Sequence, residues 1–505
     1  MQPRDGLLLE APLDDGRDGE AGAAGSGVAV TRFVQREGPF ASYEREVVEA
    51  PGGATLIDTT RYRLVVPWFR WVFALPVRWT LRRREPGDGR PPGWAPPDRL
   101  EAVHVRVLGL LAAASMSAAF INTLFTQTVN FAADDFGVGK SGQAAAGVVV
   151  RCGIVIALPF LVFADRVGRR RMMVLLAWLA PTCAAVGALA PNFWVLTASQ
   201  AVGRPLGIAL DLLIAVAATE EMPRNSRAYA VSVLAMASGL GAGIALMSLP
   251  LADLGPSGWR LVYLVSLVWL VVAWDLARRL TETARFDALA TARETSRVPL
   301  RPVHVRRRRF IAISSVSVFA NLFVAPASFF QNRYLRDIRD YSGSGIALFT
   351  VCTATPASLG FVVGGKVADL AGRRLVLAVA LPVSTFLLVG SFAVGGPWMW
   401  ITAGFGGFFG GVAYPAFAVY RTELFPTARR GQVGGFVAAL SLAGGSIGLL
   451  GAGHLLDRGW SYAEVMTFLA AGQLLAALIA LTTYPETAHR ALEELNPEDV
   501  LPAPP

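Results

Sequence analysis

Long apolar runs without a charged residue limit what this chain can fold into. No Asp, Glu, Lys or Arg occurs in residues 107–133, 172–203 or 375–420. A helix needs about 20 apolar residues to cross the hydrocarbon core of a bilayer, so the last run is long enough for two passes. Only 16% of the residues are charged, against about 25% in a soluble domain. The sequence therefore predicts an all-α protein that crosses a membrane many times.

The hydropathy pattern divides the chain into two sets of six spans, which a long Arg-rich loop separates. The predicted spans are 105–131, 142–164, 172–190, 193–218, 227–250, 259–279, 310–332, 343–365, 374–394, 397–420, 431–455 and 461–484. The predicted regions are a disordered tail (1–27), a small α+β segment (28–84), a Pro/Gly linker (85–100), a first six-helix half (101–279), a cytoplasmic loop (280–309), a second half (310–485) and a C-terminal tail (486–505).

The positive charge is concentrated in alternate loops. The formal net charge is +9, and ten arginines lie between Arg278 and Arg309. The loop at 191–192 carries no charge at all. This alternation is the positive-inside pattern of membrane proteins, so we expect a multi-pass protein of the plasma or inner membrane with both termini in the cytoplasm. We expect no nucleic-acid partner.

The two sets of spans repeat each other in sequence. Residues 165–170 (DRVGRR) recur as 369–374 (DLAGRR), and Glu282-Thr-Ala recurs as Glu486-Thr-Ala, both at an offset of 204. Glu221 with Arg227 recurs as Glu423 with Arg429 at an offset of 202. Such duplicated six-span units are one of the known transporter architectures. The repeated polar residues are Asp165, Arg166, Gly168, Arg169, Arg170, Glu221, Arg227, Asp369, Gly372, Arg373, Arg374, Glu423 and Arg429.

From about residue 101 to its end, the chain resembles the major facilitator superfamily. That family carries Gly, three residues and then Asp-Arg/Lys-x-Gly-Arg-Arg/Lys between its second and third helices. Residues 165–170 match the second part of the motif, but Leu161 occupies the glycine position. The second copy keeps Gly365 and has Leu370 in place of the basic residue. The segments 423–431, 485–487 and 282–286 look like the sugar-porter and organic-ion-transporter branch.

The resemblance implies that the repeated motif is a gate. Gly168 allows a tight turn, and Asp165 can pair with an arginine or lie at a neighbouring helix N-terminus. The arginines are expected to bind acidic lipid headgroups and the carboxylates of Glu221 or Glu423. Such a cluster would hold the cytoplasmic face shut and release it when the halves rock. The alternative is that the arginines only anchor the topology.

Ionisable residues inside the spans point to a central cavity. Arg151, Arg204 and Asp211 lie within predicted spans, where each charge costs roughly 2.5–3.5 kcal/mol. Arg204 and Asp211 are about two turns apart on one helix face and can approach each other directly or through water. We expect them to bind a polar or charged substrate or to relay a proton; the alternative is a structural salt bridge. Weaker candidates, which could equally be interhelical hydrogen bonds, are Asn122, Gln127, Asn321, Gln331, Tyr414 and Tyr420.

Proton-coupled sugar porters place an aspartate in the first helix near an arginine in the fourth. Arg204, after Gly203, resembles that arginine, whereas the first span offers Asn122 and no acid. Either Asp211 replaces the missing carboxylate, or the protein is not coupled to protons by that route.

The segment before the spans combines strand-like and helical patterns. Residues 42–48 and 54–66 are rich in β-branched and aromatic residues, and 67–84 read as a helix containing Trp68, Trp71 and Trp79. The segment loosely resembles the C-terminal part of a START or polyketide-cyclase-like domain. Its tryptophans and arginines suit the headgroup layer of a membrane with acidic lipids.

These observations favour a monomeric transporter of a small organic solute, with a proton as a candidate coupling ion. The rival interpretation is a membrane sensor that binds a small ligand without moving it. The sequence shows no convincing catalytic constellation, so we do not expect an enzyme. The Gly-rich runs within spans suit helix contacts rather than phosphate loops, and we expect no cofactor and no metal.

Overall fold

The computed structural model describes residues 7–13, 29–49, 56–82, 92, 94–138, 140–288, 305–341 and 343–496. The chain forms two compact units, Met1–Leu110 and Leu111–Pro505. Much of the predicted linker, most of the loop 280–309 and the end of the C-terminal tail lie outside the described residues.

The N-terminal unit contains a four-stranded antiparallel sheet in the order β1-β2-β3-β4. The strands are β1 (Leu9–Pro12), β2 (Ala29–Glu37), β3 (Phe40–Glu49) and β4 (Leu56–Leu64). The predicted strand at 42–48 lies within β3, and the predicted strand at 54–66 is confirmed from Leu56 to Leu64. The prediction of a disordered tail over 1–27 is wrong for β1, because a short apolar run pairs with β2 inside a Gly- and Asp-rich stretch.

Helix α1 (Arg70–Arg82) packs one face on this sheet. Val77 and Leu81 from the helix join Phe40, Tyr43 and Leu64 from the sheet in a buried apolar cluster. A buried ion-pair group crosses the strands, in which Arg45 contacts both Glu10 and Asp58 at 2.8 Å.

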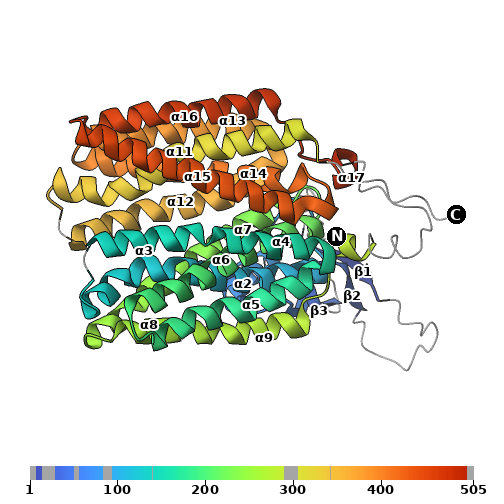
Figure 1. Cartoon of the computed structure of the whole chain (residues 1–505). Helices are drawn as coiled ribbons and strands as arrows, with labels where there is room; N and C mark the ends of the chain where they lie inside the picture. Colours follow the sequence, from blue (N-terminus) through green and yellow to red (C-terminus); the bar gives the residue numbers. More distant parts are fainter. Residues whose placement is uncertain are drawn as a thin grey trace, which may run out of the picture. The chain divides into compact units, whose positions relative to one another are not determined.

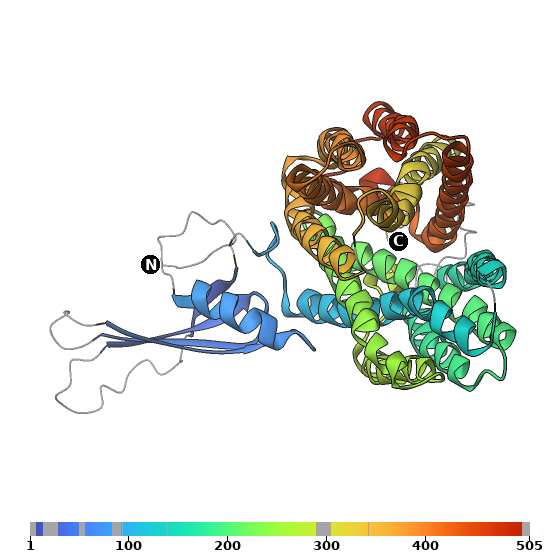
Figure 2. The same ribbon diagram turned by 90° about the vertical axis from the view of Figure 1, so that its left-hand side faces the viewer.

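The second unit is a bundle of long helices in two groups, which separate clearly when viewed along the helix axes (Figure 2). Figure 1 shows the same helices from the side. The first half contains α2 (Ala102–Asp135), α3 (Lys140–Cys152), α4 (Ile154–Val167), α5 (Arg169–Val186), α6 (Phe193–Glu221), α7 (Arg227–Met247), α8 (Trp259–Leu264) and α9 (Leu270–Arg279). The second half contains α11 (Arg307–Asp337), α12 (Gly343–Ala371), α13 (Arg373–Ala393), α14 (Pro397–Glu423), α15 (Arg430–Asp457) and α16 (Tyr462–Thr483), followed by the short α17 (Leu492–Leu495).

Two predicted spans each contain two α-helices. Helices α3 and α4 form one span that is interrupted at Gly153, and α8 and α9 are joined by a 3-10 turn, Val265–Trp269. A Cβ built on Gly153 would lie 2.3 Å from the carbonyl oxygen of Ala201 in α6. Glycine at this position therefore lets the interrupted span approach the backbone of α6 closely.

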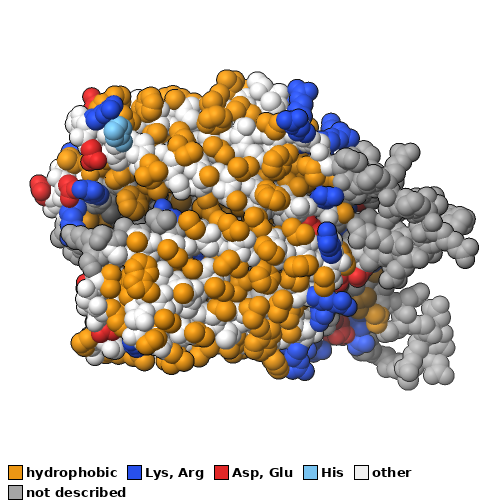
Figure 3. Space-filling model, viewed as in Figure 1, with side chains coloured by type: hydrophobic (Ala, Val, Ile, Leu, Met, Phe, Trp, Pro, Cys, Tyr) orange, Lys and Arg blue, Asp and Glu red, His pale blue; other side chains and the backbone are white. Residues whose placement is uncertain are grey.

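Eleven helical segments of the described chain are long and apolar enough to cross a membrane. The predicted span at 397–420 is also a helix, α14, with 27 residues. Its five glycines, two tryptophans and two tyrosines lower its mean hydropathy without adding charge before Arg421. Apolar side chains cover the flanks of the bundle, and arginines gather at one end (Figure 3). The chain is therefore a multi-pass membrane protein.

We call this end the arginine-rich end. Here α4, α6, α12 and α14 finish and α5, α7, α13 and α15 begin. Its exposed basic side chains include Arg166, Arg171, Arg224, Arg278, Arg279, Arg306, Arg307, Arg308, Arg374, Arg429 and Arg490.

Candidate functional site

Asp165 joins the two halves of the bundle at the arginine-rich end. It lies in the last turn of α4 and is buried. Its carboxylate accepts hydrogen bonds from the backbone N–H groups of Gly431 (3.1 Å) and Gln432 (2.9 Å), which begin α15 in the second half. Free N–H groups and the helix dipole at a helix N-terminus favour a negative charge. Asp165 also contacts Arg169 at 3.2 Å in its own half.

Asp369 makes the same contact in the opposite direction. It is buried near the end of α12 and accepts hydrogen bonds from the backbone N–H groups of Ala228 (3.3 Å) and Tyr229 (2.9 Å) at the start of α7. Arg373 contacts it at 2.9 Å, four residues along the chain. Each half therefore places one carboxylate on a helix N-terminus of the other.

A buried ion triad lies next to Asp165. The carboxylate of Glu220, in α6, contacts Arg169 at 3.3 Å and Arg430, from the second half, at 2.7 Å. Arg169 also donates to the carbonyl oxygen of Thr427 across the interface. Both arginines are almost completely buried, so the carboxylate of Glu220, rather than water, compensates their positive charge.

The second triad repeats the first with the halves exchanged. Glu423, in α14, contacts Arg373 of its own half and Arg227 of the first half, the latter at 3.0 Å. Arg373 also donates to the hydroxyl of Thr487 at 2.9 Å. Removing one member of such a buried group leaves an uncompensated charge, which costs about 3–5 kcal/mol.

These contacts correct the predicted register of the repeat. The paired residues are Glu220 with Glu423 and Arg227 with Arg430, at an offset of 203, rather than Glu221 with Glu423 and Arg227 with Arg429. Glu221 instead accepts a hydrogen bond from the N–H of Ala284 at 2.7 Å. Arg429 is exposed. Consecutive acids and consecutive arginines at these turns made both registers possible in sequence.

Two further glutamates cap the helices that follow the glycines of the motif. Glu282 accepts from the backbone N–H groups of Arg169 and Arg170, and Glu486 accepts from those of Arg373 and Arg374, at 2.9–3.1 Å. Partial burial alone raises the pKa of Glu486. The backbone N–H groups of Ala488 and the α13 N-terminus outweigh it and hold that pKa below its ordinary value.

The motif glycines leave room for these carboxylates. Gly168 has φ +121° and Gly372 has φ +104°, which side-chain-bearing residues rarely adopt. A Cβ on Gly168 would lie 2.5 Å from an oxygen of Glu282, and one on Gly372 would lie 2.9 Å from an oxygen of Glu486. Glycine is thus required at both turns for conformation and for space.

The remaining arginines of the motif lie at its edge. Arg170 donates to the carbonyl oxygens of Leu280 (2.6 Å) and Ala277 (2.8 Å) and fixes the end of α9. The side chains of Arg166 and Arg374 are exposed. They therefore lie at the surface of the arginine-rich end.

The unusual Leu161 is accommodated by a glycine in the other half. Leu161 is fully buried in α4, and a Cβ on Gly435 of α15 would lie 2.5 Å from its Cδ1. In the symmetric position Gly365 faces Ser232 of α7, with 2.6 Å between a built Cβ and the serine Oγ. At the first interface the large side chain is on the helix of the motif and the glycine is on its partner helix, and at the second interface the glycine is on the helix of the motif. Both arrangements let the two helices approach closely.

Arg204 and Asp211 do not form the predicted pair. The described ion pairs include none between them, although both lie in α6. Arg151 is the charged group that acts on Arg204, and both are cations. The expectation of a direct approach is wrong, because a separation of seven residues places the two side chains about 10 Å apart along the helix.

Asp211 instead lies in a polar group to which both halves contribute. Its carboxylate accepts from the hydroxyl of Ser115 in α2 at 3.2 Å, and Ser115 is 2.7 Å from the hydroxyl of Ser238 in α7. Arg421 and Tyr414, both in α14, are its electrostatic neighbours from the second half. Tyr414 is 40% exposed although it lies within the bundle, as expected for a side chain that borders an open space.

The other cavity candidates divide into two kinds. Asn321 donates to the carbonyl oxygen of Ser441 at 2.8 Å, so it joins α11 to α15. Tyr420 is buried and donates to the carbonyl oxygen of Pro485 at 3.0 Å, which places it beside the second triad rather than in a cavity. Asn122 faces α6 at Gly207 and has a buried Oδ1 without a hydrogen-bond partner.

Gln127 and Gln331 are half-buried in α2 and α11.

Sequence reasoning missed several residues of these clusters, among them Glu220, Arg430, Ser115 and Arg421. Glu220 and Arg430 were hidden by adjacent residues of the same type, whereas Ser115 and Arg421 carry no motif and are recognised only from their neighbours in space.

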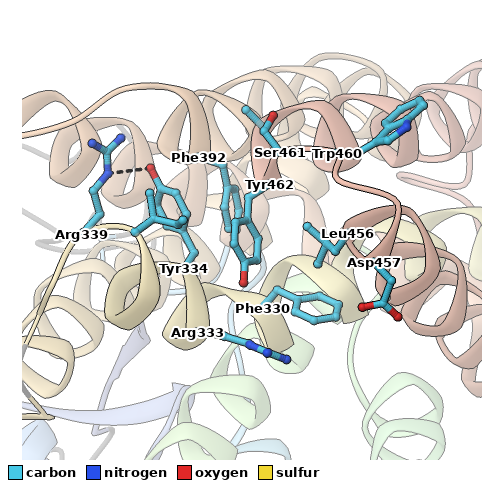
Figure 4. A pocket seen from close by; sticks show the side chains of 13 residues that line it. Phe330, Arg333, Tyr334, Arg339, Phe392, Leu456, Asp457, Trp460, Ser461 and Tyr462 are labelled. Carbon is cyan, nitrogen blue, oxygen red and sulfur yellow. Dashed lines mark hydrogen bonds between the residues drawn. The ribbon is translucent and has the colours of Figure 1, made fainter.

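A hollow of about 420 Å³ lies at the opposite end of the second half (Figure 4). Aromatic side chains line it, and the ring of Tyr334 is tilted against Phe392 and edge-on to Tyr462, at centroid distances of 5.1 and 5.5 Å. Arg339 donates to the hydroxyl of Tyr334 at 2.8 Å, and Asp457 faces the hollow. All of its lining residues belong to the second half, so relative motion of the halves does not open or close it.

A family model supports the duplicated architecture. The model described as Major Facilitator Superfamily matches residues 109–354 and 326–503. These matches cover most of the chain and leave out the N-terminal sheet. No curated protein matches the sequence significantly.

Solved transporter structures share the fold at low sequence identity. The proton:xylose symporter XylE is 16% identical, with a TM-score of 0.65 over 77% of this chain and 97% of its own. The human organic anion transporter MFSD10 is 15% identical, with a TM-score of 0.61 over 75% and 99%. FucP, the fucose:proton symporter of E. coli, in its outward conformation is 14% identical, with a TM-score of 0.60 over 76% of this chain and 100% of its own.

Proposed function

The chain belongs to the major facilitator superfamily, and we propose from this premise that it carries a small organic solute across the membrane by alternating access. Membrane transport of a solute follows from the family and the fold. The solute, the direction of transport and the coupling ion are the further parts of the proposal.

The observation that carries the proposal is the pair of symmetric locks at the arginine-rich end. Asp165 binds the N-terminus of α15, and Asp369 binds the N-terminus of α7. Both contacts join opposite halves, so any motion that separates the halves at this end breaks both. Paired, discrete contacts of this kind make two states rather than a continuous deformation.

The arginine-rich end is the cytoplasmic end in this proposal. Its exposed arginines satisfy the positive-inside rule, which places such residues in cytoplasmic loops. With both locks formed, this end is shut, and the solute pathway opens toward the other side of the membrane. Both termini then lie in the cytoplasm.

Structural relatives and the buried polar groups support the choice of solute. Among the relatives are two sugar symporters and an organic anion transporter, whose solutes are small organic molecules. Charged and polar side chains well inside the bundle, such as Arg204 and Asp211, suit a polar solute. Asp211 is the carboxylate that could take a coupling proton, because Asn122 occupies the first-helix position.

Counterflow in proteoliposomes tests the proposal. Solutes that raise the melting temperature of the purified protein are first identified among sugars, organic anions and organic cations. Vesicles preloaded with such a solute should then accumulate the labelled solute transiently, because an alternating carrier exchanges faster than it cycles empty. Binding without counterflow would contradict the proposal and would agree with the sensor interpretation, which neither the fold nor the comparisons support.

A further inference from the structure

Resting on the proposed transport function, we propose that Arg151 and Arg204 form an anion-binding subsite, so that the solute carries a carboxylate or a similar negative group. The two guanidinium groups come from neighbouring helices. Gly153 in the interrupted second span packs against Ala201 and Pro205 of α6, with a built Cβ 2.3 Å from one backbone and 3.0 Å from the proline ring. Arg151 and Arg204 directly flank this contact.

The site has positive charge without a matching acid. Arg151 is exposed and Arg204 is half-buried, and the ion pairs of the described residues include neither. The buried Nε of Arg204 also has no hydrogen-bond partner. A buried donor left without an acceptor costs about 1–3 kcal/mol, and more when it is charged.

Neighbouring residues do not neutralise this charge. Asn122, which faces α6 one turn from Arg204, is a neutral amide. Asp211 lies two turns further along α6 and is engaged with Ser115. An anionic group of the solute supplies the missing partner, and the planar guanidinium favours a carboxylate through paired hydrogen bonds.

Matched neutral and anionic probes test the subsite. Melting temperatures are measured for the full chain with sodium benzoate or benzamide, and with galacturonate or galactose, at constant ionic strength. We expect the anion of a pair to stabilise the wild type more than its neutral partner. Arg204→Gln and Arg151→Gln should each weaken anion binding about tenfold or more, as expected for the loss of a charge-assisted hydrogen bond. Arg333→Gln, in an exposed pair at the opposite end, is the matched control.

The outcomes separate this inference from the transport proposal. Equal or stronger stabilisation by the neutral probes, or anion binding that survives Arg204→Gln, overturns the anion subsite. So does the absence of stabilisation by either anion. Counterflow of a neutral solute would in that case still support the transport proposal. Charge-selective binding without counterflow would support the anion subsite and contradict transport.

A separate observation concerns helix α1, and from it we infer that this helix docks on the bilayer surface. Trp71, Leu75 and Trp79 recur every four residues on one face and are 76%, 75% and 54% exposed. The opposite face, with Val77 and Leu81, is buried against the sheet. The exposed stripe is therefore not needed for the core of the N-terminal unit.

The surroundings of the stripe point to lipid as its partner. Arg78 and Arg82 are exposed beside it, and arginine next to tryptophan suits an anionic headgroup layer. Within the same unit, a Cβ on Gly109 of α2 would lie 2.6 Å from Cδ of Pro67, three residues before α1 begins. Pro67 therefore lies beside the first turns of a helix that is long and apolar enough to cross a membrane.

Spin-label accessibility in the full chain tests this docking. Leu75→Cys on the stripe is compared with Ile57→Cys on the sheet, which is also apolar and 61% exposed, after Cys152, Cys183 and Cys352 are replaced by serine. In nanodiscs containing anionic lipid, the label at 75 should be reached by oxygen and shielded from a water-soluble nickel complex, and the label at 57 should show the reverse.

The arginines should set the lipid dependence of the docking. Replacing Arg78 and then Arg82 by glutamine should lower the ratio of docked to undocked helix about fivefold at each step, at low ionic strength. Equal aqueous accessibility at 75 and 57 would overturn the inference. Spin–spin broadening at 75 in nanodiscs would also overturn it, because the stripe would then bind a second copy of the chain.

Discussion

Replacing Asp165 by asparagine should open the arginine-rich end without unfolding the protein. Asparagine has nearly the same volume and keeps one carbonyl oxygen for the N–H groups of Gly431 or Gln432, which Asp165 binds at 3.1 and 2.9 Å. It loses the negative charge that interacts with the α15 N-terminus and with Arg169. Arg169 retains the carboxylate of Glu220 at 3.3 Å and the carbonyl oxygen of Thr427 as acceptors, so its guanidinium stays hydrogen-bonded.

The size of the effect follows from these contacts. A charge at a partly buried helix terminus contributes up to about 2 kcal/mol, and hydrogen bonds to charged groups contribute about 1 kcal/mol more than neutral ones. A loss of about 2 kcal/mol shifts the balance between the closed and open states roughly 30-fold. Asp369→Asn should act similarly, since it breaks the symmetric lock on α7.

Double electron–electron resonance in nanodiscs measures this shift between the closed and open states. Spin labels are placed at Leu175 and Val379, which are exposed, lie nearly two turns into α5 and α13, and belong to opposite halves. In Asp165→Asn the population with a longer distance should grow relative to the parent. The control is Asp337→Asn, which removes an exposed carboxylate at the opposite end and should change nothing. Unchanged distances in both Asp165→Asn and Asp369→Asn would refute the lock and leave the arginines as topological anchors.

Three further predictions concern packing, charge and pH. Gly435→Ser should clash with Leu161 and lower the melting temperature. The double variant Gly435→Ser with Leu161→Gly recreates the arrangement of Gly365 and Ser232 and should restore the melting temperature. A double variant no more stable than Gly435→Ser alone would contradict this account of the packing. In double-mutant cycles on the melting temperature, Asp211→Asn should couple to Arg421→Gln by about 0.5–3 kcal/mol but be additive with Arg204→Gln within about 0.5 kcal/mol; the reverse pattern would restore the pair within α6. Folding lowers the pKa of Glu486, so its stabilising contribution is present above the unfolded pKa of about 4.3 and disappears as the pH falls through the folded pKa. Glu486→Gln should lose this part of the pH dependence of the melting temperature between pH 6 and 3. Identical pH profiles for the wild type and Glu486→Gln would show that the capping bonds contribute nothing.

The fold was largely predictable because its main constraints are local. Apolar runs and charge placement specify the spans, and the duplicated motif specifies the two halves. The strand β1 and the breaks at Gly153 and in the sixth span were not predicted, since each depends on neighbours in space. Gly153, for example, is explained only by the backbone of Ala201 in another helix.

The candidate site was predictable in kind but not in pairing. The motif allowed Asp165 either an arginine or a neighbouring helix N-terminus, and the structure gives it both. It did not distinguish Glu220 from Glu221 or Arg430 from Arg429, because neighbouring residues of the same type differ only in the face of the helix they occupy. Arg204 and Asp211 seemed paired from their spacing, yet the ion pairs of the described residues give Arg204 no acid, and Asp211 accepts a hydrogen bond from Ser115 of α2.

Reversible cross-linking of the two halves is the most direct test of the central claim. Asn225 follows α6 of the first half and His489 follows α16 of the second half, both at the arginine-rich end, with their side-chain atoms 2.6 Å apart. In a chain otherwise free of cysteine, Asn225→Cys with His489→Cys should form a disulfide that holds this end shut. Alternating access predicts that oxidation abolishes counterflow of a transported solute and that reduction restores it, with each single variant unaffected. Full transport by the cross-linked protein would contradict the account.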